Sequence, residues 1–176
     1  MRTIFNHDED LMTTACFLVD KQGRAFSGFA KCEPEDKDFY SRLTGETIAH
    51  LKASIEAEKS YRNELKNELK VLKNYHSNIV NAKWYNRQNP MAKHLYKTIM
   101  DLEDEINASK DYAEKMKNEL RTFIDNKEKF YDMVRRNRRL EAAILKMEEA
   151  EESGDDKAMI DASVEYFNIL KENFEK

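Results

Sequence analysis

The sequence predicts a mainly α-helical protein with an N-terminal β-hairpin, a long antiparallel coiled-coil hairpin and a C-terminal helical hairpin. Three observations indicate this fold class. Charged residues make up 36% of the chain and apolar residues 40%, a balance typical of long amphipathic helices. Only four glycines and two prolines interrupt the 176 residues. Apolar residues recur every three or four positions over two long stretches. We therefore divide the chain into residues 1–45, 46–139 and 140–176.

The β-hairpin is expected in residues 12–32. Met12–Asp20 is rich in β-branched and aromatic residues, which favour strands. Gly23 lies in the turn Lys21–Arg24 and can adopt a positive φ, and Ala25–Cys32 supplies the returning strand. Because an isolated hairpin is only marginally stable in water, we expect it to pack against the helix that follows.

The first long helix is expected to run from about Glu46 to Val80, with Thr44 as its N-cap. Its apolar residues keep the helical spacing, but Glu58 and Arg62 occupy two positions of the apolar stripe. Two interpretations of this pair remain open. It either forms a buried polar layer that fixes the register of the coiled coil, or it reaches solvent at the edge of the seam.

The second long helix is expected to begin at Pro90, because proline is favoured in the first turn of a helix. Its stripe continues to Val134 in alternating steps of three and four, the coiled-coil period. Folding the chain at about residue 87 makes the two helices antiparallel. In that register Leu65 faces Ser109.

The C-terminal hairpin is formed by two shorter helices, Leu140–Glu152 and Lys157–Phe174. Gly154 is the expected C-cap of the first and Asp155 the N-cap of the second. The last helix is expected to have its large apolar residues on one face. This face comprises Ile160, Val164, Phe167 and either Ile169 or Leu170.

The sequence lacks the signals of a membrane protein, a metalloprotein or a known class of enzyme. No segment approaches the roughly 18 apolar residues of a membrane span, and the first residues lack an apolar signal core. Cys16 and Cys32 fit a reducing compartment. Glu46 and His50 lie one helical turn apart, but no second ligand pair accompanies them. We expect a cytoplasmic protein with no membrane contact, no metal, no cofactor and no catalytic residues.

Charge is distributed unevenly along the chain. Residues 1–43 have a net charge of −2, residues 44–139 of +5 and residues 140–176 of −7. A basic middle between acidic ends indicates a charged partner.

Two segments have residue types that bind nucleic acid. The first combines aromatic rings for stacking with basic groups for phosphates, and the second supplies basic groups alone. The two segments are Lys83, Trp84, Tyr85 and Arg87 at the expected hairpin tip, and Arg135, Arg136, Arg138 and Arg139. Each has a structural alternative. The aromatic residues can close the end of the coiled coil, and the arginines can pair with the acidic tail that follows them.

Acidic segments point to the opposite kind of partner. Closely spaced carboxylates can lie in a basic channel that normally holds nucleic acid, although most such runs are solvated surface. The candidates are residues 102–105, residues 148–156 and the connection after the hairpin, with Glu33, Glu35, Asp36, Asp38 and Phe39.

A pattern in the N-terminal part resembles a known group of proteins. It reads G-x-A-K-C-x-P-E-D-x-D-F from Gly28, T-G-E-T-I-A-H-L-K-A from Thr44 and S-Y-R-N-E-L-K from Ser60. It is similar to small proteins encoded by phages and prophages of Firmicutes, some of which resemble anti-CRISPR inhibitors of Cas9. With the coiled-coil layout, the resemblance covers about half the chain. It implies a non-catalytic protein that binds a host nuclease, such as Cas9 or its guide-RNA complex.

The main hypothesis is therefore an inhibitor that occupies and restrains a host nuclease. Its expected partner-binding residues are Glu33, Glu35, Asp36, Asp38, Phe39, Trp84, Tyr85 and Arg87. One alternative is a nucleic-acid-binding accessory protein that uses Lys83 and the arginine cluster. Another is a structural coiled coil that forms a homodimer through its apolar stripe.

Overall fold

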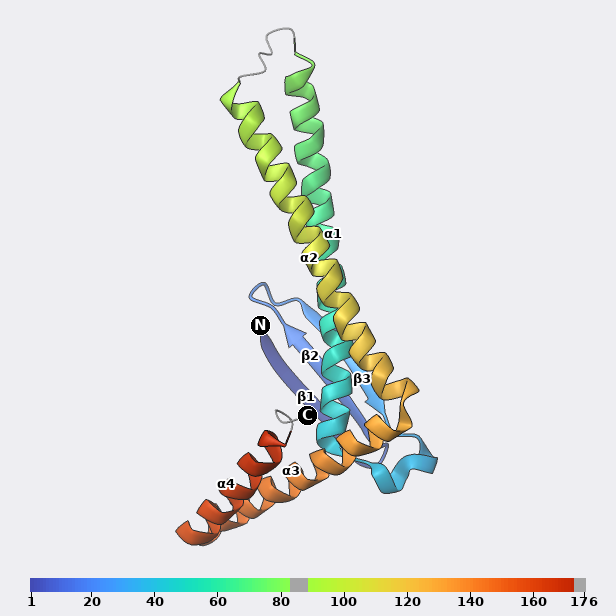
Figure 1. The fold of residues 1–176 in the computed structure, drawn as a ribbon, viewed down its shortest axis with the longest axis vertical. Coiled ribbons are helices and arrows are strands. Elements are labelled where there is room, and N and C mark those ends of the chain that lie inside the picture. Colours follow the sequence, from blue (N-terminus) through green and yellow to red (C-terminus); the bar gives the residue numbers. More distant parts are fainter. Residues whose placement is uncertain (83–88, 173–176) are drawn as a thin grey trace.

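The computed structural model describes residues 1–82 and 89–172 and shows an elongated molecule with a base and a long helical arm (Figure 1). The base holds a three-stranded sheet, the lower part of two long helices and a C-terminal helical hairpin. The arm consists of the upper parts of the two long helices. The mainly α-helical fold class is confirmed, with each of its three expected parts present.

The sheet has one more strand than the sequence analysis predicted. Strands β1 (Arg2–Asp8), β2 (Thr13–Val19) and β3 (Ala25–Lys31) pair antiparallel in the order β1-β2-β3. The predicted hairpin is β2-β3, and Gly23 in its turn has a φ of 81° as expected. Strand β1 was missed because only Phe5 and His7 alternate with outward residues, too short a pattern to distinguish from a polar N-terminal segment.

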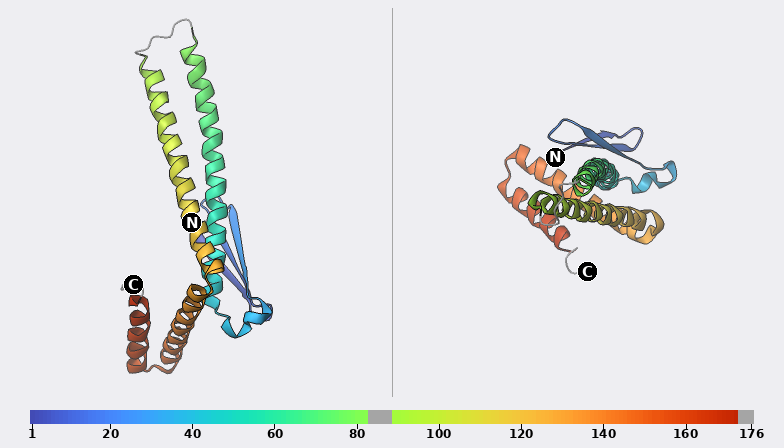
Figure 2. Two further views of the ribbon diagram at one scale, coloured as in Figure 1. Left: turned by 45° about the vertical axis from the view of Figure 1, so that its right-hand side comes forward. Right: turned by 90° about the horizontal axis from the view of Figure 1, so that it is seen from above.

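Helix α1 (Arg42–Val80) lies between the sheet and the second long helix (Figure 2). Small residues allow it to approach the sheet closely, since Ala49 and Ala53 are 0% exposed. A Cβ on Gly28 would lie 2.0 Å from the carbonyl oxygen of Ala49 and 2.5 Å from the amide nitrogen of Ala53. The segment from Gly28 to Ala53 is therefore a sheet–helix packing interface.

The N-terminus of α1 lies earlier than predicted. Ser41 is the N-cap, and its Oγ accepts a hydrogen bond from the amide of Thr44 at 3.1 Å. The assignment of Thr44 as the cap was wrong. Both residues have a capping hydroxyl, but Thr44 is buried in the first turn, where its Oγ1 accepts from Nδ2 of Asn137 at 3.0 Å.

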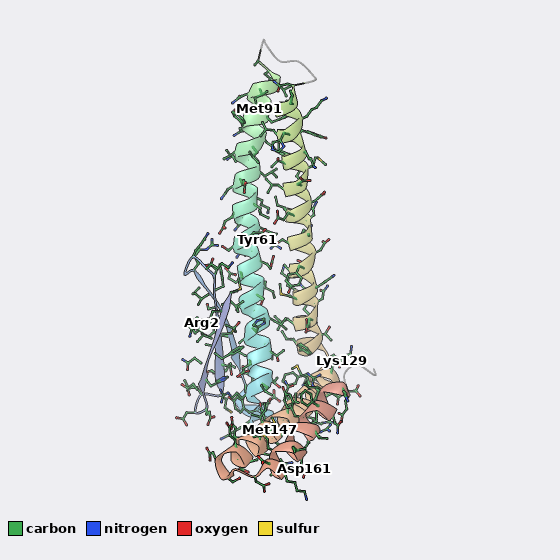
Figure 3. The ribbon with its side chains drawn as sticks, turned by 90° about the vertical axis from the view of Figure 1, so that its left-hand side faces the viewer. Arg2, Tyr61, Met91, Lys129, Met147 and Asp161 are labelled. Atoms are coloured by element: carbon green, nitrogen blue, oxygen red, sulfur yellow. The ribbon has the colours of Figure 1, made fainter. Side chains whose placement is uncertain are left out.

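Helix α2 (Pro90–Asp125) runs antiparallel to α1 and completes the arm (Figure 3). Pro90 opens the helix as predicted, and Oδ1 of Asn89 caps it by accepting from the amide of Met91 at 2.9 Å. Helix α1 has 39 residues and is therefore about 58 Å long. It belongs to both the base and the arm.

A polar layer interrupts the apolar seam where the arm begins. Ser109 is 7% exposed, and its Oγ donates to Oε2 of Glu58 at 2.7 Å. Nη1 of Arg62 donates to the carbonyl oxygen of Ser109 at 3.2 Å, and beside them Tyr61 donates to Glu105. Of the two interpretations of Glu58 and Arg62, the structure shows the polar layer, with both side chains half-buried.

We expect Glu58 and Ser109 to be energetically coupled. Replacing either one by alanine removes the hydrogen bond and leaves a polar partner in the seam, so each variant should lose about 1 kcal/mol of unfolding free energy. The double variant should lose less than the sum of the two single losses. Urea denaturation of the four proteins in a double-mutant cycle measures this coupling. Additive losses would contradict the polar layer.

The second and third helices are divided differently from the prediction. Helix α2 ends at Asp125, and helix α3 (Lys127–Ser153) follows at once, capped by Oδ1 of Asn126, which accepts from the amide of Lys129 at 3.1 Å. The expected continuation of the second helix to Val134 was therefore wrong, and so was the start of the third helix at Leu140. An asparagine cap ends the coiled coil without any glycine or proline to mark it.

The turn of the C-terminal hairpin is as predicted. Gly154 has a φ of 68° and ends α3, and Oδ1 of Asp155 accepts from the amides of Lys157 and Ala158. Helix α4 (Asp156–Lys171) then packs back along α3. The α3–α4 hairpin leaves the base at an angle to the coiled coil (Figures 1 and 2).

Candidate binding surfaces

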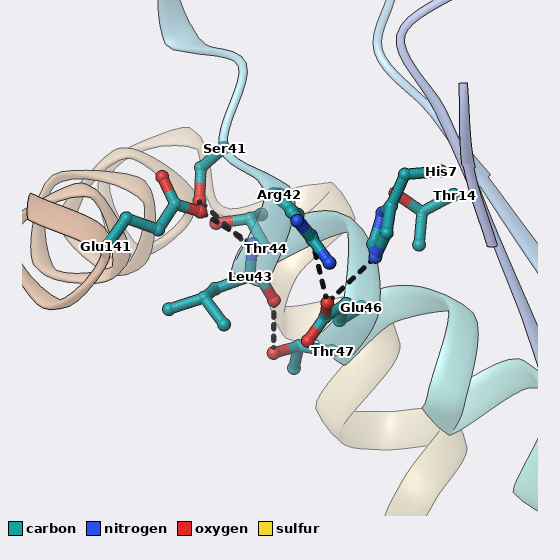
Figure 4. Close-up of polar contacts among 9 residues, drawn as sticks. All are labelled: His7, Thr14, Ser41, Arg42, Leu43, Thr44, Glu46, Thr47 and Glu141. Atoms are coloured by element: carbon teal, nitrogen blue, oxygen red, sulfur yellow. Dashed lines mark hydrogen bonds and ion pairs between the residues drawn. The ribbon is translucent and has the colours of Figure 1, made fainter. Parts of the chain in front are cut away.

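Helix α3 is fixed to the base by polar contacts at the N-terminus of α1 (Figure 4). Oε1 of Glu141 accepts from Oγ of Ser41 at 2.9 Å and from the amide of Leu43 at 2.7 Å. Nε of Arg138 donates to the carbonyl oxygen of Tyr40 at 3.0 Å. A carboxylate here satisfies free amides and interacts favourably with the helix dipole. These contacts join segments about one hundred residues apart in the sequence.

A carboxylate, an imidazole and a hydroxyl lie in a row beside this cap (Figure 4). Nε2 of His7 is 2.9 Å from Oε1 of Glu46, and its Nδ1 is 3.2 Å from Oγ1 of Thr14. Arg42 lies 3.5 Å from the same Glu46 oxygen. The order of groups is that of a nucleophilic triad, but Thr14 is 1% exposed, so almost none of its surface is open to solvent. The row instead joins β1 to α1.

The acidic connection folds as a 3₁₀ helix, Pro34–Phe39, which lies partly against the base. Glu33 is exposed and Asp36 is half-buried, while the ring of Phe39 packs against Tyr131 of α3 with centroids 4.7 Å apart. The side chains of Glu35 and Asp38 lie outside the described part of the structure. The predicted partner surface is therefore partly used to hold the connection in place.

A cavity of about 140 Å³ lies beneath this connection and is lined by Cys32, Asp36 and Tyr40. Sγ of Cys32 donates to the carbonyl oxygen of Asp36 at 3.3 Å. Burial, and then the negative charges of Asp36 and Glu33, raise the pKa of the Cys32 thiol. A thiol that stays protonated at neutral pH is a weak nucleophile. The Cys32 thiol is therefore not activated for covalent chemistry in this cavity.

The arginine cluster is largely engaged within the molecule. Arg139 forms a two-pronged ion pair with Glu172 at 2.8 and 2.9 Å, as expected if the arginines pair with the acidic tail. Arg138 contacts the base as described above, Arg135 lies 3.5 Å from Asp132, and Arg136 is half-buried. Arg135, Arg136 and Arg139 line one open groove that also contains the acids Asp132 and Glu172, whereas Arg138 contacts the base.

The tip residues Lys83, Trp84, Tyr85 and Arg87 lie outside the described residues, so their role stays a prediction. The helices that lead to the tip are strongly basic. Residues 66–100 contain seven lysines or arginines and one acid, Glu68, a net charge of +6. The net charge of residues 44–139 conceals this concentration, because the acids of residues 101–125 offset it.

The apolar face predicted for α4 points into solvent. Ile160, Val164 and Phe167 are 63%, 53% and 60% exposed, whereas Ala162 and Ile169 are buried. Ile169, one of the two alternatives for the fourth position of that face, lies on the buried side of the helix. Helix α4 is apolar on two opposite faces. Helix α3 covers the face that contains Ala162 and Ile169.

Among residues 1–82 and 89–172, no group of three or more His, Cys, Asp or Glu residues could hold a metal ion. None of the helices in these two ranges is long and apolar enough to cross a membrane. No protein-family model, curated protein or solved structure matches the chain.

Proposed function

We propose that this is a non-catalytic protein that binds another protein through the exposed face of α4. The observation that supports the proposal is the placement of Ile160, Val164 and Phe167 at i, i+4 and i+7, which puts three large apolar side chains on one face in solvent. A helix with apolar residues on opposite faces is typical of one that is covered on both sides. In this chain α3 covers one side.

The surroundings of this α4 face also fit an interface. Asp156, Lys157, Asp161 and Lys171 are exposed on the same helix. A small apolar centre with a charged rim is the usual anatomy of a protein–protein interface, and aromatic side chains such as Phe167 often dominate its binding energy.

A guide-loaded Cas9 is the partner we propose, because the pattern from Gly28 to Lys66 resembles inhibitors of that nuclease. Inhibition would be steric and electrostatic. The face of α4 would bind the nuclease, and the neighbouring turn would place carboxylates in a channel that normally holds nucleic acid. The exposed acids of this turn are Glu148, Glu149, Glu151, Glu152, Asp155 and Asp156.

The experiment is a pull-down of guide-loaded Cas9 followed by a DNA cleavage assay. The test variant is Val164→Asp/Phe167→Asp, and the matched control is Ala142→Asp/Leu145→Asp, which adds the same two acids at exposed apolar positions of α3. We expect the wild-type protein and the control to retain Cas9 and slow cleavage. The test variant should lose at least about tenfold in affinity, since two desolvated apolar anchors are replaced by charges.

The outcomes separate the partner from the surface. Unchanged cleavage and no co-purification with the wild-type protein would refute Cas9 as the partner. Equal retention by the test variant would refute the α4 face as the binding surface.

Light scattering of the free chain tests the scaffold hypothesis. A dimer that the Val164→Asp/Phe167→Asp change dissociates would identify a second copy as the occupant.

A further inference from the structure

The distal part of the arm presents a basic face that the proposed protein contact does not use. Lys66, Lys70 and Lys73 follow one another at i, i+4 and i+7 and therefore lie on one side of α1. On α2, Lys93 and Lys97 are one turn apart. The whole protein has a net charge of −4, so the +4 of the described residues 66–82 and 89–100 is a local excess of positive charge.

Two contacts place Lys73 of α1 and Tyr96 of α2 on the same side of the coiled coil, and Lys93 lies about one turn before Tyr96. Nζ of Lys73 pairs with Oε1 of Glu103 across the seam at 2.5 Å. Tyr96 is two helical turns before Glu103 on α2, and its ring lies 6.1 Å from that of His76 on α1. We call the resulting surface the basic face. It consists of Lys66, Lys70, Lys73, Lys93, Tyr96 and Lys97.

The groups of the basic face are available to a ligand. Tyr96 is 57% exposed, and all five lysines are exposed. Within the described residues, Lys66, Lys70, Lys93 and Lys97 form no ion pair, while Lys73 is neutralised by Glu103. Four lysines without an ion pair exceed the exposed acids beside them, Glu68 on α1 and Asp101 one turn after Lys97 on α2, so the local field is positive.

We propose that the basic face binds the sugar–phosphate backbone of nucleic acid, with the Tyr96 ring stacking on a base when the strand is single. Lysines along a helix contact phosphates without reading sequence, so binding should be independent of sequence and weakened by salt. An exposed aromatic ring among them adds stacking that only unpaired bases can supply. The proposal does not depend on the α4 face, which lies on the hairpin at the base.

The test is fluorescence anisotropy with labelled oligonucleotides and the full chain, between about 50 and 200 mM salt. The probes are single-stranded DNA, single-stranded RNA and double-stranded DNA. The variant Lys66→Ala/Lys70→Ala/Lys93→Ala should bind each probe at least about tenfold more weakly. Its salt dependence should have a log–log slope less steep by about 2 to 3 for three lost phosphate contacts.

The matched control is Lys21→Ala/Lys115→Ala/Lys127→Ala, which removes the same charge from exposed positions outside the basic face. We expect it to bind almost as well as the wild-type protein. An equal loss in the control would show that net charge alone drives binding and would overturn the site. The site would also be overturned if the wild-type protein bound none of the probes. Polyglutamate that binds as tightly as the oligonucleotides would overturn it too, because such binding would indicate an acidic protein as the ligand.

Tyr96 gives a second measurement, which a purely electrostatic surface would not affect. Tyr96→Ala should weaken binding to the single-stranded probes and leave double-stranded DNA unchanged, whereas Tyr96→Phe should retain both. An equal effect on all probes, or none on any, would overturn the stacking part of the proposal.

Discussion

Replacing Gly28 with alanine is expected to destabilise the base by about 3 kcal/mol, the upper part of the usual range for overpacking. The added Cβ would lie 2.0 Å from the carbonyl oxygen of Ala49 and 2.5 Å from the amide nitrogen of Ala53. Both are backbone atoms inside a helix, so neither can move aside by changing a rotamer. The sheet has to separate from α1. Urea denaturation followed by circular dichroism measures the loss.

The control for this change is Gly23→Ala in the β2–β3 turn. Gly23 has a φ of 81°, but no atom lies within 4 Å of its added Cβ. Its loss should be about 1 kcal/mol, the cost of a left-handed conformation without a clash. If both variants lose the same stability, close packing at Gly28 is not the reason for the glycine.

Glu141→Ala should have the next largest effect on stability, about 2 kcal/mol, because two hydrogen bonds to a carboxylate are lost. Its Oε1 accepts from Oγ of Ser41 and from the amide of Leu43, and both donors would lose this partner in a half-buried site. Glu141→Gln should lose less, since an amide oxygen can still accept. Thermal unfolding followed by circular dichroism compares the variants.

Glu148→Ala is the control for Glu141, because Glu148 is an exposed acid on the same helix. We expect a change within about 0.5 kcal/mol of zero, as for most surface substitutions. A loss as large as that of Glu141→Ala would mean that the removal of a negative charge from α3 explains the effect, and not the cap, since alanine itself favours the helix.

Local signals in the sequence were enough to place several helix ends. Pro90 opens α2, and Gly154 and Asp155 separate α3 from α4, because each fixes the backbone of its own turn. Helix ends that depend on a residue far away in the sequence could not be predicted from local signals. Ser41 caps α1 together with Glu141 of α3, and no local pattern distinguishes it from Thr44.

Periodicity predicted which residues share a face but not what covers that face. The spacing of Ile160, Val164 and Phe167 correctly places them together, yet the core contact is made by Ala162 and Ile169 on the other side of α4. The same limit applies to charge. The run of arginines was evident in the sequence, but the pairing of Arg139 with Glu172 depends on how the chain folds back.

One uninterrupted helix, α1, is clamped by the sheet at one end and forms half of the arm at the other. It therefore fixes the distance between the base and the far end of the arm. A partner that engages both the arm and the base must present its own two sites at the matching separation, so recognition includes a test of spacing as well as of surface chemistry. When the spacing fits, the second contact forms at a high effective concentration, and two weak contacts together give tight binding.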